Sequence, residues 1–349
     1  VQVATVPSGS GGSIVEIDVY EKPRWTVELG AGWDSERGFE ARTGVRDDNL
    51  FGRGVSANLR VRASAEEKFA LLYGSLPPLP GGRMTIGTTL SYSELNREVA
   101  FSDVALSYRE LETSASIDLV YELAPRTTLK PYVRFDRTQF DFGDSLFDDT
   151  IVTTTLGGAA FHERFDNRFD PRKGYSLVAG AGWSSSYFGS DLETVRGMVS
   201  GSLAVSPWTG WTWVQTVRAG AAEPLRGTML DPTVRFFAGG QGSIRGFDFE
   251  SVGPGFETST GAVPLGGGAL FILNEELRTP LWKSLRGAVF VDTGQVWPSW
   301  DDAGWQLSTS VGLGLRWSTP VGLVWGDAAW PVANVGISSR DPKFYFGIG

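Results

Sequence analysis

Hydrophobic and polar residues alternate along most of the chain with a period of two. Over residues 55–64 every odd position is apolar and every even position is polar, and a similar alternation recurs over 129–138 and 306–317. Successive side chains of a β-strand point to opposite faces, whereas a helix repeats every 3.6 residues. These segments therefore predict strands with one apolar face and one polar face.

The length of the alternating runs separates two kinds of all-β protein. A soluble sandwich or small barrel has strands of about 5–6 residues, whereas a transmembrane strand needs about 9–11. The runs in this chain are about ten residues long, and their polar faces carry many Arg, Asp and Glu side chains, which suit a hydrated lumen. We therefore predict an all-β fold, a transmembrane antiparallel β-barrel whose apolar face points at lipid.

The alternation predicts about sixteen strands, an even number as in bacterial single-chain barrels. Their expected ranges are 24–33, 37–47, 55–65, 67–76, 83–94, 104–121, 126–138, 149–163, 174–184, 193–206, 211–222, 267–280, 285–296, 304–317, 320–331 and 343–349. If the N-terminus is periplasmic, the connection at 223–266 is extracellular. A loop of that length is usually functional or disordered.

The first residues do not follow the barrel pattern. Residues 7–12 (PSGSGG) are typical of a flexible turn, and 14–20 form a short alternating stretch followed by a charged linker. We predict that 24–349 form the barrel domain and that 1–23 are the remnant of an upstream domain with its linker.

The composition argues against catalysis and against metal or cofactor binding by this chain. It has 349 residues, a formal net charge of −9, no cysteine and one histidine, His162. These counts exclude disulfides, thiolate zinc sites and His-rich metal sites, and the acidic balance argues against a nucleic-acid partner. The usual hydrolase and nucleotide-binding motifs are also missing. We predict no enzyme activity, catalytic residue, cofactor or metal, and interpret His162 as a hydrogen-bonded lumen or turn residue.

One motif in the long connection points to a family. The stretch contains Gly239 and Gly240, then Ile244, Arg245, Gly246 and Phe247. It resembles the [IV]-R-G-[FY] signature of the sixth extracellular loop of the BamA/TamA-type superfamily of outer-membrane assembly and translocation barrels. Further similarity lies at 47–54, 166–174, 264–267, 276–281, 289–297, 312–317 and 319–322, and the wording of 264–267 and 312–317 leans towards TamA.

The resemblance covers about 24–349 and implies a function. It implies an integral protein of the Gram-negative outer membrane that inserts or translocates other outer-membrane proteins, with the bilayer and those clients as partners. It also implies that 1–23 end the last POTRA domain, and that missing POTRA domains would receive clients and periplasmic or inner-membrane subunits. Relatives usually end with an aromatic residue a few positions further on, so Gly349 suggests a missing C-terminus or a departure from the pattern.

Strand parity gives the signature loop a place to bind. If Val289 and Val291 face lipid, Phe290 and Asp292 face the lumen. The same parity turns two further wall residues inward, Glu276 and Arg278, and leaves Glu275 facing lipid, unless it lies near the rim or a bulge shifts the register. Arg245 would meet the inward acids if its loop folds back into the barrel, and the resemblance implies the same contact with Asp292.

The seam between the first and last strands is the second candidate site. A barrel closes by pairing these two strands. The first contains Val27, Gly30 and Gly32, and the last contains Phe344, Phe346 and Gly347. Glycine weakens a strand, so this seam could open and offer an edge to a client strand. An ordinary closed seam, whose glycines only accommodate curvature, is the other interpretation.

Three other functions remain open at this point. The barrel could be a polypeptide secretion pore of the same superfamily, an anchor for an upstream hydrolase domain, or a passive porin.

Overall fold

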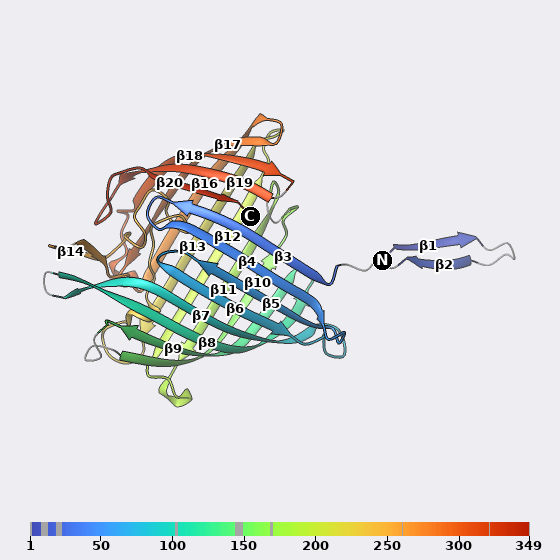
Figure 1. The fold of residues 1–349 in the computed structure, drawn as a ribbon, viewed down its shortest axis with the longest axis horizontal. Helices are drawn as coiled ribbons and strands as arrows, with labels where there is room; N and C mark the ends of the chain where they lie inside the picture. The colour runs from blue at the N-terminus through green and yellow to red at the C-terminus, as the bar shows by residue number, and fades with distance from the viewer. Residues whose placement is uncertain are drawn as a thin grey trace.

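A computed structural model describes residues 2–7, 13–18, 23–101, 104–143, 149–167, 170–259, 261–320 and 322–348. Sixteen antiparallel strands close into a barrel (Figure 1), as the sequence predicts. The barrel strands are β3 (Trp25–Asp34), β4 (Gly38–Leu50), β5 (Val55–Ala63), β6 (Glu67–Ser75), β7 (Met84–Phe101), β8 (Val104–Ala124), β9 (Thr127–Asp141), β10 (Asp149–Glu163), β11 (Gly174–Ser184), β12 (Thr194–Val205), β13 (Thr212–Pro224), β16 (Ala269–Trp282), β17 (Leu285–Trp297), β18 (Ser308–Thr319), β19 (Gly322–Ala333) and β20 (Lys343–Ile348).

The predicted boundaries fail mainly where strands leave the membrane. β7 continues seven residues beyond its expected end at residue 94 and pairs with β8 up to Phe101↔Val104. Both faces of such an extension are wet, so the alternation fades although the ladder of backbone hydrogen bonds continues. At the other extreme, β18 begins at Ser308 rather than at 304, and the connection before it contains a short 3-10 helix, η3 (Trp300–Asp302).

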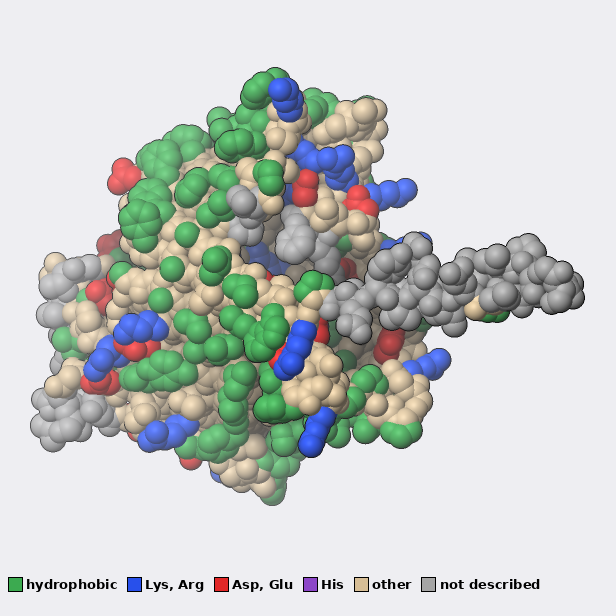
Figure 2. All heavy atoms as spheres, turned by 45° about the vertical axis from the view of Figure 1, so that its right-hand side comes forward, with side chains coloured by type: hydrophobic (Ala, Val, Ile, Leu, Met, Phe, Trp, Pro, Cys, Tyr) green, Lys and Arg blue, Asp and Glu red, His purple; other side chains and the backbone are tan. Residues whose placement is uncertain are grey.

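The outer wall of the barrel is apolar. Val289, Val291 and Leu313 are 48%, 42% and 58% exposed, whereas Phe290 and Asp292, which alternate with them, are buried towards the lumen. Figure 2 shows apolar side chains spread over the wall, with charged side chains gathered towards its ends. No helix of the described residues is long and apolar enough to cross a membrane.

A small hairpin precedes the barrel. It pairs β1 (Gln2–Pro7) with β2 (Ser13–Asp18), and Figure 1 shows it beyond the end of the barrel at which β3 begins. The sequence predicted only the second of these strands, within 14–20. Most of the predicted turn, residues 8–12, lies outside the described residues, as do the last two residues of the stretch 14–20 and the first two of the linker that follows it.

The long connection between β13 and β16 folds back against the inner wall. It contains the 3-10 helix η2 (Pro232–Val234) and a hairpin of β14 (Gly255–Thr258) and β15 (Gly261–Pro264), neither of which the sequence predicted. Isolated bridges tie Ala238 to Val252 and Phe236 to Gly267. The loop therefore has a fixed shape of its own.

Candidate functional site

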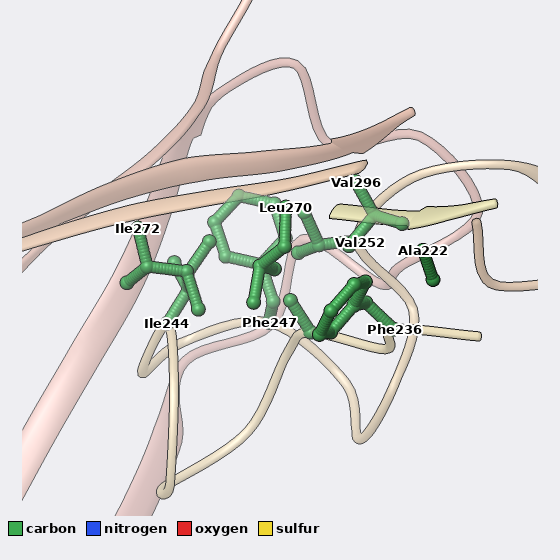
Figure 3. Close-up of a cluster of buried hydrophobic side chains, with 9 residues drawn as sticks. Ala222, Phe236, Ile244, Phe247, Val252, Leu270, Ile272 and Val296 are labelled. Carbon is green, nitrogen blue, oxygen red and sulfur yellow. The ribbon is translucent and has the colours of Figure 1, made fainter. Parts of the chain in front are cut away.

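The signature loop has a hydrophobic core of its own that includes the barrel wall. Phe236, Ile244, Phe247 and Val252 of the loop are 0–3% exposed. They pack with four buried wall residues (Figure 3), which are Ala222 of β13, Leu270 and Ile272 of β16, and Val296 of β17. Burying one such side chain contributes about 1.5–3 kcal/mol, so the cluster holds the loop to the wall.

Two signature glycines are needed for close approach. Gly239 has a φ of 120°, and a Cβ there would lie 2.3 Å from the backbone oxygen of Asp248. Gly246 has a φ of 90° and lies against the wall, where a Cβ would meet Ala329 and Ser310 at 3.2 Å. Other residues rarely adopt such φ values. Glycine at these positions lets Arg245 and Phe247 reach the wall from opposite sides of a tight turn.

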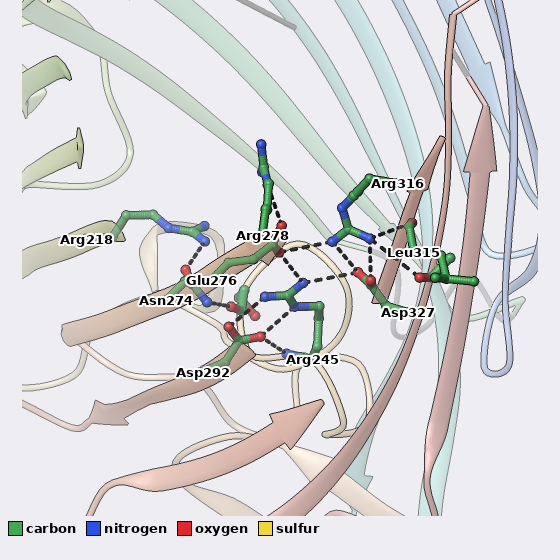
Figure 4. Close-up of polar contacts among 11 residues, drawn as sticks. Arg218, Arg245, Asn274, Glu276, Arg278, Asp292, Leu315, Arg316 and Asp327 are labelled. Carbon is green, nitrogen blue, oxygen red and sulfur yellow. Dashed lines mark hydrogen bonds and ion pairs between the residues drawn. The ribbon is translucent and has the colours of Figure 1, made fainter. Parts of the chain in front are cut away.

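Arg245 lies in a socket of carboxylates on the lumen wall (Figure 4). Its Nε is 2.7 Å from Oδ2 of Asp292, its Nη2 is 2.9 Å from Oδ1, and its backbone N–H donates to the same carboxylate. Nη1 lies 3.1 Å from both Glu276 of β16 and Asp327 of β19. Asp292 is 0% exposed. Bidentate, charge-assisted bonds of this kind are the strong ones, and here they fix one side chain to three strands.

The face of Phe290 completes the socket. Cζ of Arg245 lies 3.4 Å from the centre of this ring, which is a cation–π contact. The ring occupies the space in front of Gly312 on β18, where a Cβ would lie 2.0 Å from a ring carbon. The first glycine of the 312–317 motif is therefore required by the aromatic ring across the strand.

A second layer of ions surrounds the socket. Arg316 of β18 contacts both Glu276 and Asp327, at 3.0 Å and 2.5 Å. Gly314 leaves room for this pair, because a Cβ there would lie 2.2 Å from an Asp327 oxygen. Arg278 donates to Glu276 at 2.7 Å. Together with Arg286 and Asp170, which pair with each other, the network has four arginines and four acids, so its charges balance.

The structure brings together most of the predicted loop and wall residues. Arg278 faces inward, as parity predicted, and it contacts Glu276 and Asp170. The sequence reasoning missed Asp327 and Arg316 as partners, although both lie on inward-facing positions and Arg316 is in a quoted motif. Asp170 belongs to the 166–174 motif, in which residues 168 and 169 lie outside the described residues.

Glu275 faces lipid because β16 keeps its parity. The register shift of this strand comes later, between Pro280 and Trp282, so a bulge does not turn Glu275 inward. Its carboxylate instead accepts hydrogen bonds from Trp213 and Gln215 of the neighbouring strand β13. These donors reduce the cost of a charge on the outer wall.

The described pairing of the seam covers four residue pairs. β20 pairs with β3 from Tyr345↔Asp34 to Ile348↔Ala31, which brings Gly32 opposite Gly347. By contrast, β3 pairs with β4 along its whole length. Val27 and Gly30 lie below the last seam pair, and no described residue pairs with them from the seam side. Phe344 and Phe346 face outward, and the partner of Phe346 is Trp33.

The loop also contacts both strands of the seam. Tyr345 of β20 accepts a hydrogen bond from the backbone of Gly246 at 3.0 Å. Asp248 forms an ion pair with Lys343 of β20, and Lys343 lies 3.0 Å from Glu36 in the turn between β3 and β4. We call Glu36, Asp248 and Lys343 the seam clasp. Burial and the neighbouring Asp248 carboxylate raise the pKa of Glu36 to about 7, although Lys343 opposes the shift.

His162 makes contacts that support the wall of the barrel. Its Nδ1 lies 2.8 Å from the Thr127 hydroxyl and its ring stacks on Tyr175. It sits on the outer face of β10 beside that tyrosine, rather than in the lumen or a turn as the sequence interpretation had it. Among the described residues, no group of His, Asp and Glu side chains is arranged to hold a metal ion.

The chain is similar in sequence to known outer-membrane proteins over most of its length. Residues 49–349 match the model of the Omp85 superfamily domain. A curated relative, the outer membrane protein assembly factor BamA of Neorickettsia risticii (strain Illinois), is 26% identical over 90% of this chain and 44% of its own length. The chain spans less than half the length of the curated relatives that it matches.

Two solved structures share the fold. BamA from Haemophilus ducreyi lacking POTRA domains 1–3 has a TM-score of 0.77 at 17% identity, covering 99% of this chain and 74% of that one. CdiB from Acinetobacter baumannii has a TM-score of 0.68 at 13% identity, covering 99% and 64%. The predicted BamA/TamA-type barrel is thus confirmed, whereas the leaning towards TamA stays a prediction.

Proposed function

Because the chain belongs to the Omp85 superfamily, we propose that this barrel inserts or translocates other outer-membrane proteins. It is an integral outer-membrane protein and not an enzyme. Its clients, any periplasmic or inner-membrane subunits, and the assignment of residues 1–23 to the end of a POTRA domain are parts of this proposal.

The observation that carries the proposal is the glycine pair at the seam. The described pairing places Gly32 of β3 opposite Gly347 of β20, and glycine weakens a strand because it has no side chain to pack. Once this pairing opens, the exposed edge of β3 is a template for another strand. A client strand that adds to β3 would gain backbone hydrogen bonds while its apolar side chains enter lipid directly. No covalent chemistry is needed for this step.

The signature loop supports the same role by stabilising the opposite side of the seam. It joins β16, β17 and β19 through Arg245, and β20 through Tyr345. These contacts keep the C-terminal strands together when β3 separates from β20. The seam can therefore exchange partners without loss of the barrel.

A disulfide across the seam tests this function. The pair Trp33→Cys and Phe346→Cys joins two residues that lie opposite each other across the seam. Val27 lies on the same strand as Trp33 but is not opposite Phe346, so it is unsuitable for this cross-link. The matched control is Val45→Cys with Leu59→Cys, which joins β4 to β5 at an outward-facing pair whose side chains are 37% and 45% exposed. We measure insertion of an eight-stranded outer-membrane barrel into vesicles that contain the protein.

The seam disulfide should abolish insertion, reduction should restore it, and the control disulfide should leave it unchanged. Insertion at the wild-type rate through an oxidised seam would refute the proposal. The similarity of the fold to CdiB fits a second function, secretion of an extended polypeptide through the lumen. Secretion by the oxidised seam variant, with insertion absent from the wild type, would favour that alternative.

A further inference from the structure

On one flank of the barrel, over β6 to β9, the outer face carries basic side chains above an apolar row. One apolar row crosses these four strands in register, and its members are Leu72, Leu90, Ala115 and Phe135. Leu72, Leu90 and Phe135 are 44%, 51% and 46% exposed, as lipid-facing side chains are. The next outward positions towards the extracellular end are Ala70, Tyr92, Thr113 and Arg137, so the large aliphatic side chains of the lipid-facing band end at this row.

Three basic side chains project outward just above that row. We call Lys68 of β6, Arg109 of β8 and Arg137 of β9 the basic flank. Arg137 is two residues beyond Phe135, Lys68 is four from Leu72, and Arg109 is six from Ala115. At about 3.3 Å per residue along tilted strands, these side chains span the layer in which lipid headgroups lie.

The basic flank is confined to this part of the wall. By strand parity, no other described strand residue that faces outward is Lys or Arg, and the remaining strands carry only neutral or acidic side chains there, such as Glu275. The whole chain has a net charge of −9. All outward cations of the described strands thus lie on this flank, which also carries the outward acids Glu94, Glu98 and Asp141.

The present partners of the three cations are weak competitors. Lys68 lies 3.0 Å from Glu94, and Arg109 pairs with Asp141, but the basic side chains are 61% and 55% exposed. Exposed ion pairs of this kind contribute little to stability, because solvent screens them. The only polar contact of Arg137 among the described residues is with Gln139 at 3.1 Å, so most of its guanidinium donors remain available. Guanidinium groups bind phosphate in a bidentate manner, which is stronger.

We propose that the basic flank binds the phosphorylated headgroup of a glycolipid in the outer leaflet. The acyl chains of the lipid would lie on the apolar row of β6 to β9, and its phosphates would bind Arg137, Lys68 and Arg109. This flank is separated from the seam by β4 and β5. The site would therefore hold an ordered lipid near the seam without blocking it.

The experiment measures binding of a purified phosphorylated outer-leaflet glycolipid by native mass spectrometry of the protein in detergent micelles. The triple variant K68Q/R109Q/R137Q should bind at least tenfold more weakly than the wild type, and the wild type should prefer the phosphorylated lipid to its dephosphorylated form. The matched control is Arg226→Gln, an extracellular loop cation with a 79% exposed side chain, which should bind as the wild type does. Excess inorganic phosphate should not displace the lipid.

Equal binding of the two lipid forms, or unchanged affinity of the triple variant, would overturn the proposal. Displacement by inorganic phosphate would also overturn it, by showing an anion site rather than a lipid site. If the triple variant fails to fold, Arg137→Gln alone provides the test, because this side chain has no ion pair to lose among the described residues. That variant should weaken lipid binding several-fold.

Discussion

The two sides of the seam hold their luminal arginines in different ways. On the C-terminal side, Arg245 and Arg316 are nearly buried and pair with carboxylates on β16, β17 and β19. On the N-terminal side, Arg42 of β4 and Arg60 of β5 are exposed in the lumen and have no ion pair among the described residues. The ion pairs of the first wall are nearly buried, whereas those of the second, such as Arg62 with Glu67, involve a cation that is 41% exposed.

The difference indicates which side of the seam moves. Moving a wall strand on the C-terminal side would break several desolvated ion pairs, each of which is costly once a partner is lost. Moving β3 with β4 and β5 would break the short seam pairing and the seam clasp. We infer that the loop side is the fixed part and that the N-terminal hairpins are the mobile part.

The largest effect on stability is expected from Arg245→Ala. It removes the cation from a carboxylate, Asp292, that is 0% exposed, so we expect a loss of about 3–5 kcal/mol in the free energy of unfolding. The change should lower the temperature at which the folded barrel unfolds in a heat-modifiability gel. Arg226→Ala, in the same loop but exposed, should unfold as the wild type does. Equal heat stability of all three proteins would contradict the fixed-wall interpretation.

A smaller effect is expected from Gly312→Ala. The new methyl group would overlap the Phe290 ring and displace it from Arg245, at a cost of about 1–3 kcal/mol in unfolding free energy. The control is Gly326→Ala on the neighbouring strand β19, where a Cβ would have an ordinary contact at 3.6 Å. Urea unfolding in micelles compares the two variants. A destabilised control with a stable Gly312→Ala would show that the ring does not need this space.

The smallest effect concerns pH and the mobile side. Because the pKa of Glu36 is raised from 4.5 to about 7, its contribution to stability is complete below about pH 4.5 and is lost as pH rises through about 7. Heat stability should therefore fall between pH 5 and pH 8, and Glu36→Gln should reduce that dependence. If Glu36→Gln keeps the full wild-type pH dependence, the seam clasp does not titrate in this range.

The sequence predicted the strands and their faces because both follow from a local period of two. Parity alone turned Asp292 and Glu276 inward, and the family motif identified Arg245 as the residue that reaches them. The axial offset between neighbouring strands cannot be predicted in this way, because it depends on the stagger of the whole barrel. Neither the seam pairing of Phe346 with Trp33 nor the proximity of Asp327 to Arg245 could be obtained from parity.

Residues outside the lipid were harder still to predict. The extension of β7 and β8 and the hairpin of β14 and β15 lie where both faces are wet, so hydrophobic alternation gives no signal there. Glu36 and Lys343 come together only because the barrel closes, from positions near opposite ends of the chain. Such a contact has no local pattern in the sequence.

The socket of Arg245 has a consequence for the order of folding. Its carboxylates come from β16, β17 and β19, and the neighbouring Gly246 binds Tyr345 of β20. All of these strands follow the loop in the chain, so the socket does not exist when the loop is made. In an unfinished barrel the loop would stay open to proteases, and it becomes protected only when the last strand has joined. Its resistance to cleavage is thus a gauge of barrel completion.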